Sequence, residues 1–141
     1  MAKTVVVDSD AIYALYNSDD PLNNRATKTF QKLIEDDFHL IYPTSVIFES
    51  VSLFQRVHPS PEVTEMLVDM IKNDELLIYT IDNRLLKETA NIFKPAGSKK
   101  NTLVDCSVIA VAKKIKADGV FAYDEFYKKQ GLKLADDVIK I

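Results

Sequence analysis

Short apolar runs alternate along the chain with longer segments in which apolar residues recur every three or four positions. The short runs predict buried strands, and the longer segments predict amphipathic helices. Strands are expected at residues 4–8, 39–42, 76–79 and 119–123, with a last edge strand at 132–135. Helices are expected at residues 10–17, 22–36, 44–56, 62–73, 82–94 and 102–117, with a short helix or turn at 124–130. Strands that alternate with helices favour an α/β fold with a parallel sheet covered on both faces.

Prolines and small polar residues mark the expected boundaries of these elements. Pro21 suits the first turn of the second helix, where the N–H that proline lacks has no helical partner. Pro43 ends the second strand, so Thr44 or Ser45 can cap the helix that follows. The helix at 102–117 is largely apolar, and we expect it to be the central helix of the fold.

Length and composition narrow the class of protein. A chain of 141 residues fits a single domain, residues 1–141. The lone cysteine, Cys106, excludes an internal disulfide and a CxxC metal motif, and it suits a reducing cytoplasm. We expect its thiol to be buried as a small apolar group. The first apolar run is too short for a signal peptide, and no run reaches the ~18 residues of a membrane span.

Two aspartates come directly after predicted buried strands. Asp8 follows three valines, and Asp124 ends the run GVFAY. Both are therefore expected at the carboxyl ends of parallel strands, where the ligand crevice of an open α/β sheet lies. The alternative is that each aspartate only caps the helix that follows it.

Two further acids lie near the apolar faces of predicted helices. Glu49 has Val46 and Leu53 at positions i−3 and i+4, which places it at or near the buried stripe. Asp105 precedes the apolar run 108–112. A buried carboxylate is costly unless it is paired or bound to a metal. Glu49 could instead reach water at the rim, and the helix dipole favours an acid at the position of Asp105 whatever its function.

Carboxylates that converge without histidine or cysteine suit a hard cation such as Mg²⁺ or Mn²⁺. Such a metal can orient a phosphodiester, activate water and stabilise the leaving oxygen. The net charge of −3 argues against a module that binds nucleic acid through phosphate contacts alone. Leaving the four acids out of the count changes this charge from −3 to +1. His39 and His58 fall at a strand start and in a loop, and no GxSxG, Walker A or GxGxxG motif is present.

Four stretches of the sequence carry a family resemblance. They are VVVDSDAIYAL, YPTSVIFESVSLF, LVDCSVIAVAKK and GVFAYDEFYKKQGLKL, and together they cover nearly the whole chain. In order and spacing the chain resembles the PIN-domain family, including the VapC-like toxins of toxin–antitoxin modules. The resemblance implies a three-layer α/β/α sandwich with a parallel sheet of about five strands.

The resemblance also implies an Mg²⁺- or Mn²⁺-dependent endoribonuclease, usually a homodimer, that cleaves RNA. It carries the family's acidic positions onto Asp8, Glu49, Asp105 and Asp124. Asp8 and Asp105 would be the most direct metal ligands, and Glu49 would be a ligand or would orient the attacking water. Asp124 would bind the same metal or a second, weaker one. A toxin would have a small antitoxin protein as partner, whereas an RNA-processing enzyme would have none.

Several positions depart from the family pattern or leave two interpretations open. Asp10 stands where many members have a small polar residue, and it either orients bound water or adds charge to the first helical turn. Ala122 stands where the family often has Thr or Ser, which leaves the last acid less supported and puts the second metal in doubt. Lys99 and Lys100 either contact RNA phosphates or are solvated. Tyr13, Tyr16 and Tyr127 either stack on bases or pack at a dimer interface, and we favour packing.

Two other functions are compatible with parts of the sequence. Asp8 and Asp10 form the DxD motif that opens phosphatases of the haloacid-dehalogenase type, but Ala11 and Ile12 follow where that family usually has Gly-Thr. The chain is also short for that fold with its cap. A non-catalytic PIN-like module that binds RNA or protein is the second alternative, and the presence of all four acids favours catalysis over it.

Overall fold

The computed structural model describes residues 2–98 and 100–139. Within them, four parallel strands form one sheet in the order β3-β2-β1-β4. The strands are β1 (Thr4–Val7), β2 (His39–Pro43), β3 (Leu77–Tyr79) and β4 (Gly119–Phe121). The longer helices are α1 (Ser9–Tyr16), α2 (Asn23–Glu35), α3 (Thr44–Ser52), α4 (Pro61–Lys72), α5 (Asn83–Ile92) and α6 (Leu103–Ile115). Two short helices, α7 (Phe126–Lys129) and α8 (Ala135–Val138), follow β4.

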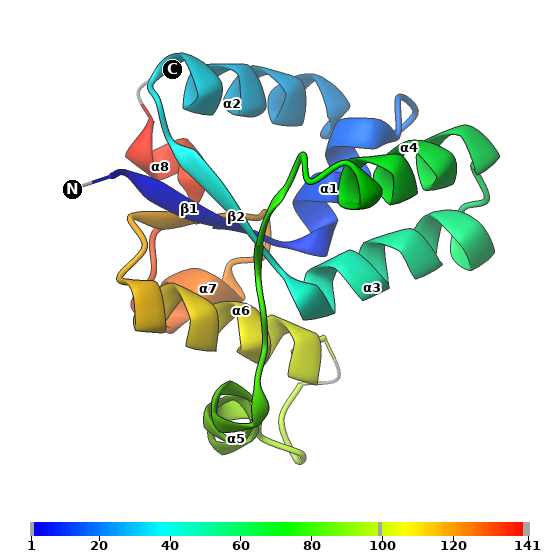
Figure 1. The fold of residues 1–141 in the computed structure, drawn as a ribbon. Coiled ribbons are helices and arrows are strands. Elements are labelled where there is room, and N and C mark those ends of the chain that lie inside the picture. The colour runs from blue at the N-terminus through cyan, green and yellow to red at the C-terminus, as the bar shows by residue number, and fades with distance from the viewer. Residues whose placement is uncertain (1, 99, 140–141) are drawn as a thin grey trace.

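Helices cover both faces of the sheet, with α2 on one side and α5 and α6 on the other (Figure 1). The expected three-layer α/β/α class is therefore confirmed. The three valines of β1 are at most 2% exposed, as suits β-branched residues in a strand covered on both faces. Residues 106–112 of α6 are buried, which confirms this helix as the central one. Cys106 is a buried free thiol, as expected.

The expectation of about five strands is corrected to four. The segment predicted as a last edge strand, 132–135, pairs with β4 only through an isolated bridge between Val120 and Leu134. The Val120 N–H donates to the Lys133 carbonyl over 2.8 Å, but Ala135 already begins α8. A strand cannot continue here because the chain turns into a helix whose first residue is buried against the core.

The helix expected at 44–56 differs in its cap and in its last turn. Neither Thr44 nor Ser45 caps α3, which starts after Pro43 without a side-chain cap. The Thr44 hydroxyl instead accepts the Ile81 N–H, because it faces the neighbouring segment rather than its own helix. From Leu53 to Val57 the α-helix gives way to a π-helical turn. Such turns are rare and often occur near functional sites.

The carboxyl ends of the central strands gather the chain segments that carry the candidate acids. β1 lies between β2 and β4, and its register pairs Val7 with Phe121. The Asp8 N–H continues this ladder by donating to the Phe121 carbonyl over 3.0 Å. α1 begins directly after β1 and α3 directly after β2, so both helices start at this edge. None of the described helices is long and apolar enough to cross a membrane.

Candidate metal centre

Asp8 lies at the centre of the candidate site and is only 3% exposed. It is the N-cap of α1, with Oδ1 accepting the Ser9 N–H over 2.8 Å. Its other oxygen, Oδ2, accepts the Tyr127 hydroxyl over 2.6 Å. Burial and the negative charge of Asp10 raise the pKa of Asp8 well above its usual range. Asp8 thus caps the helix that follows it, but capping accounts for only one of its two oxygens.

Asp10 belongs to the same group of acids, and its side chain makes a contact outside its own helix, which a charge in the first helical turn would not need. Its Oδ2 accepts the Tyr123 N–H over 2.9 Å, which ties α1 to the segment after β4. Its Oδ1 is buried and has no hydrogen-bond partner among the described residues. Burial raises the pKa of Asp10 to about 6, and the charges of Asp124 and Asp105 add to this rise. An orphaned carboxylate oxygen of this kind calls for a cation or an ordered water.

Asp105 enters the site from the start of α6. It forms a capping box with Thr102, in which Asp105 Oδ2 accepts the Thr102 N–H over 3.0 Å. Its Oδ1 lies 3.4 Å from the Tyr127 hydroxyl. Burial, followed by repulsion from Glu49 and Asp124, raises the pKa of Asp105. The capping box fixes the carboxylate in the position where these charges meet.

Glu49 and Asp124 complete the group. Glu49 is half-buried on α3, and its Oε1 accepts a hydrogen bond from the Ser9 hydroxyl. Asp124 Oδ1 accepts the Phe126 N–H over 2.9 Å, so it also supports the turn into α7. The charges of both acids act on Asp105. The structure therefore brings together Asp8, Asp10, Glu49, Asp105 and Asp124, from four segments of the chain.

The donor set fits a hard divalent cation, because it consists of carboxylate oxygens. The unpaired oxygen of Asp10 and the raised pKa values of Asp8, Asp10 and Asp105 show a surplus of negative charge that a cation would neutralise. In residues 2–98 and 100–139, no three acidic, histidine or cysteine side chains already stand in the arrangement that would hold one ion. A shared ion therefore requires some of these carboxylates to rotate, since several oxygens now accept protein hydrogen bonds.

Comparisons with known proteins bear on the family and the fold of this chain. The sequence model of the PIN domain matches residues 5–132. The chain belongs to the PIN-domain family. Its fold is similar to the crystal structure of VapC20 from Mycobacterium tuberculosis, described as a toxin that cleaves the sarcin–ricin loop, with a TM-score of 0.77. The two chains are 16% identical, and the match covers 91% of this chain and 95% of VapC20, so it establishes a common fold. A search of curated proteins gives no match.

Tyr127 of this PIN domain behaves differently from the sequence-based expectation. Tyr127 is fully buried inside the chain, so it neither stacks on bases nor packs at a dimer interface, and its hydroxyl donates to Asp8. Sequence reasoning missed this contact, because no local pattern shows that a hydroxyl 119 residues away reaches Asp8. Lys99 lies outside the described residues. Lys100 is exposed in the loop before α6, and Lys94 and Lys129 line a cavity of about 230 Å³ that also includes Cys106 and Phe126.

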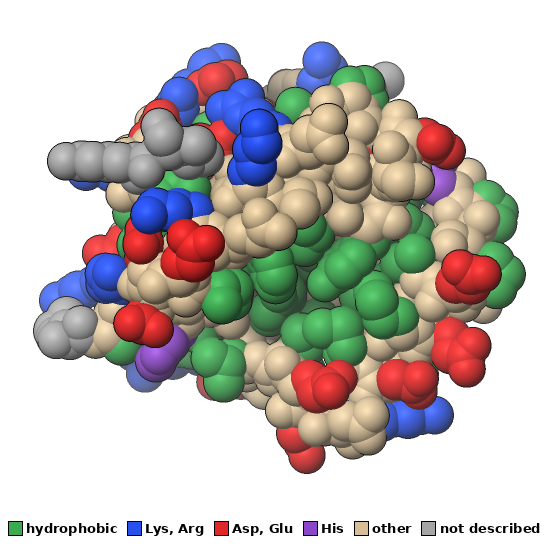
Figure 2. Space-filling view, turned by 90° about the horizontal axis from the view of Figure 1, so that it is seen from above, with side chains coloured by type: hydrophobic (Ala, Val, Ile, Leu, Met, Phe, Trp, Pro, Cys, Tyr) green, Lys and Arg blue, Asp and Glu red, His purple; other side chains and the backbone are tan. Residues whose placement is uncertain are grey.

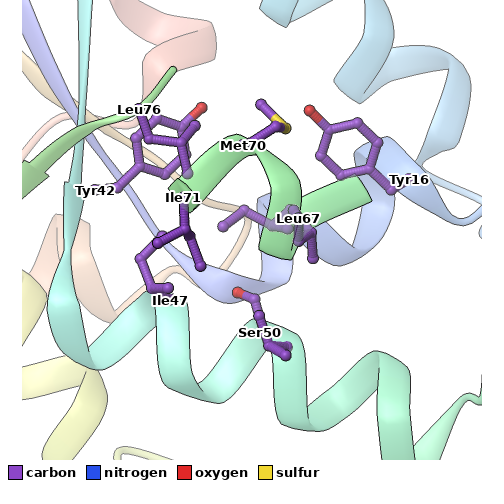
Figure 3. Close-up of a pocket in the computed structure, with 10 residues that line it drawn as sticks. Tyr16, Tyr42, Ile47, Ser50, Leu67, Met70, Ile71 and Leu76 are labelled. Carbon is purple, nitrogen blue, oxygen red and sulfur yellow. The ribbon is translucent and has the colours of Figure 1, made fainter. Parts of the chain in front are cut away.

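The other side of α3 forms a contrasting, apolar pocket. Figure 3 shows Ile47 and Ser50 pointing from α3 toward Leu67 and Ile71 of α4, between Tyr16 and Tyr42. The pocket holds about 10 Å³, and no acidic side chain lines it. On the face that looks upward in Figure 1, hydrophobic side chains gather in a hollow with acidic side chains along part of its edge (Figure 2). The pocket between α3 and α4 has the composition of core packing, whereas the candidate acids lie on the other side of α3.

Proposed function

We propose that this PIN domain is an Mg²⁺- or Mn²⁺-dependent endoribonuclease whose site is formed by Asp8, Asp10, Glu49, Asp105 and Asp124. The observation that carries the proposal is the convergence of five carboxylates, one with a buried and unpaired oxygen, at the carboxyl ends of parallel strands. A bound divalent cation would supply Lewis-acid stabilisation of the phosphodiester and of the leaving oxygen. Such a cation lets an acidic chain hold a polyanionic substrate.

Each acid has a role that its contacts support. Asp8 and Asp105 would hold the cation, since they are held in place by hydrogen bonds from the Ser9 and Thr102 N–H groups. The free Oδ1 of Asp10 would turn to the same ion or to a water bound on it. Asp124, which also supports α7, would serve the same ion or a second one.

Glu49 is the candidate general base. Its Oε1 accepts the Ser9 hydroxyl, which orients the carboxylate and leaves Oε2 for another partner. In the proposed reaction Oε2 accepts the proton of the attacking water. The alternative retained for Glu49 is direct metal binding, and the contacts are compatible with both.

The partners of this domain are also proposals. RNA is the substrate, and the lysines before α6, together with Lys94 and Lys129, would meet its phosphates. A toxin role would require an antitoxin protein, and carboxylates in such number would accept one of its basic side chains. A homodimer is supported by exposed apolar side chains at Phe48, Leu77 and Ile78, which are 75%, 54% and 40% exposed on α3 and β3. A lone cysteine forms no internal disulfide and suits a reducing compartment, so the proposed location is the cytoplasm.

The test is to incubate the protein with structured and single-stranded RNA in the presence of Mg²⁺, Mn²⁺ or EDTA. The variant Asp8→Asn keeps the shape of the side chain and removes its charge. Asp118→Asn is the matched control, because Asp118 lies at the opposite end of the same strand pair and accepts the Thr4 N–H. We expect metal-dependent cleavage that Asp8→Asn abolishes and Asp118→Asn retains. Hydrolysis of a generic phosphate monoester without RNA cleavage would overturn the assignment in favour of a phosphatase.

A further inference from the structure

Tyr127 is the largest of the fully buried side chains, and its polar end lies among carboxylates rather than in the core. Its hydroxyl is 2.6 Å from Asp8 Oδ2 and 3.4 Å from Asp105 Oδ1. A packing role would be filled equally well by phenylalanine, which needs no partner for a buried hydroxyl. The position of the hydroxyl therefore needs its own explanation.

We propose that Tyr127 is a positioning residue that fixes the Asp8 carboxylate for metal binding and sets its spacing from Asp105. This inference rests on the proposed function. It assigns to Tyr127 a role that the family's acidic positions do not include.

The hydroxyl has one hydrogen, and the distances show which carboxylate receives it. A 2.6 Å contact is a short, charge-assisted hydrogen bond, whereas 3.4 Å is too long for a strong one. Asp8 is thus held at both oxygens, by Ser9 N–H at Oδ1 and by Tyr127 at Oδ2. A carboxylate with two fixed donors keeps one rotamer. The remaining lone pairs of its oxygens then keep one direction toward Asp105.

Tyr127 also links Asp8 to the last acid of the group. Asp124 accepts the Phe126 N–H and so holds the start of α7, from which Tyr127 projects. Asp8, Asp105 and Asp124 come from three separate segments. The Tyr127 hydroxyl lies between Asp8 and Asp105, and the neighbouring Phe126 N–H bonds Asp124. A displacement of α7 would therefore change the geometry of all three.

The sequence shows why this chain needs such a donor. Continuing the pairing of Val7 with Phe121 by one residue brings Ala122 beside Asp8. Ala122 is 3% exposed and carries no hydroxyl, so it cannot donate to Asp8. In this chain the hydroxyl that reaches Asp8 comes instead from Tyr127, five residues later.

The test compares Tyr127→Phe with the wild-type protein in two measurements, the Kd of Mn²⁺ by calorimetry and the kinetics of RNA cleavage. Loss of a hydrogen bond that orients a metal ligand typically costs about 10–100-fold in affinity or activity. We expect Tyr127→Phe to weaken Mn²⁺ binding by about 10-fold or more and to lower kcat while KM for RNA stays the same. Adding Ala122→Ser to Tyr127→Phe is expected to recover part of the Mn²⁺ affinity.

The matched control is Tyr42→Phe, which removes a tyrosine hydroxyl from the apolar pocket on the other side of α3 (Figure 3). This variant is expected to bind Mn²⁺ like the wild type. If Tyr127→Phe binds Mn²⁺ and cleaves RNA like the wild type, or loses only thermal stability, Tyr127 packs and the inference is wrong. If the wild-type protein neither binds Mn²⁺ nor cleaves RNA, the proposed function itself fails.

Discussion

The two sides of α3 show two different uses of buried polar atoms. Glu49 faces the acids at the strand ends, whereas Ser50, the next residue, points into the apolar pocket beneath α4 (Figure 3). Each region contains a buried polar atom without a partner in the described chain, Asp10 Oδ1 on one side and Ser50 Oγ on the other. A buried hydroxyl without a partner costs about 1–3 kcal/mol, but the pocket of about 10 Å³ has room for one water that would bond it. An unpaired carboxylate is far more costly, so the acidic side of α3 lowers the free energy of unfolding, whereas the apolar side raises it.

The largest expected effect is on the acidic side. Asp105→Asn removes the charge of a proposed metal ligand but keeps the capping geometry, since an amide oxygen can still accept the Thr102 N–H. Metal-assisted stabilisation is worth several kcal/mol, so kcat/KM should fall on the order of 10³-fold. RNA cleavage assays and thermal unfolding check this prediction together. Activity within a few-fold of wild type would exclude Asp105 from the site. A large fall in Tm would show that Asp105 also contributes to stability, contrary to the comparison.

The apolar side should respond in the opposite way. Leu67→Ala leaves a cavity under α4, because Leu67 is 6% exposed and lines the pocket. Such truncations cost about 3 kcal/mol of unfolding free energy. Urea unfolding should show this loss, while kcat of the folded protein stays near that of the wild type. A large loss of kcat at full occupancy of the folded state would show that the two sides are coupled.

A smaller effect is expected from Asp10→Asn in metal-free protein. Burial raises the pKa of Asp10 from 3.8 to about 6, so the folded state keeps a proton that the unfolded chain releases between these pH values. The contribution of Asp10 to stability therefore falls as pH rises through this window, and the penalty is complete above pH 6. At pH 7 in EDTA, removing the charge should stabilise the protein by roughly 2–3 kcal/mol.

The pH profile of stability separates this explanation from a packing effect. Between pH 4 and 6 the wild-type protein in EDTA should lose stability relative to Asp10→Asn, and saturating Mn²⁺ should remove the difference. A constant offset between the two proteins at every pH would contradict the electrostatic origin of the effect.

The smallest effects distinguish two serines, one on each side of α3. Ser9→Ala removes the hydroxyl that orients Glu49 and should lower kcat about tenfold, since a hydrogen bond to a charged carboxylate is worth about 1.5 kcal/mol. Ser50→Ala removes a hydroxyl with no partner in the described chain, so it should leave both kcat and Tm nearly unchanged. Equal behaviour of the two variants would mean that Ser9 does not orient Glu49.

The positions of the strand-end acids were predictable because they follow from local patterns. Three valines before Asp8 and the run GVFAY before Asp124 locate the ends of two buried strands, and parallel strands bring such ends to one edge. The fifth strand was predicted wrongly, because local alternation at 132–135 cannot show that the chain turns into α8 after a single bridge. The cap of α3 was missed for a similar reason, since the Thr44 hydroxyl has a partner 37 residues away.

The sequence by itself determined the α/β alternation, the central apolar helix and the residues from which an acidic site could be built. Only the tertiary structure decided how these acids are held: Ser9 orients Glu49 across 40 residues, and Tyr127 holds Asp8 across 119. It also revealed that Asp10 lies inside the group with an unpaired oxygen. The physical reason is that periodicity records which residues are buried, whereas a hydrogen bond between distant segments depends on packing that no local pattern contains.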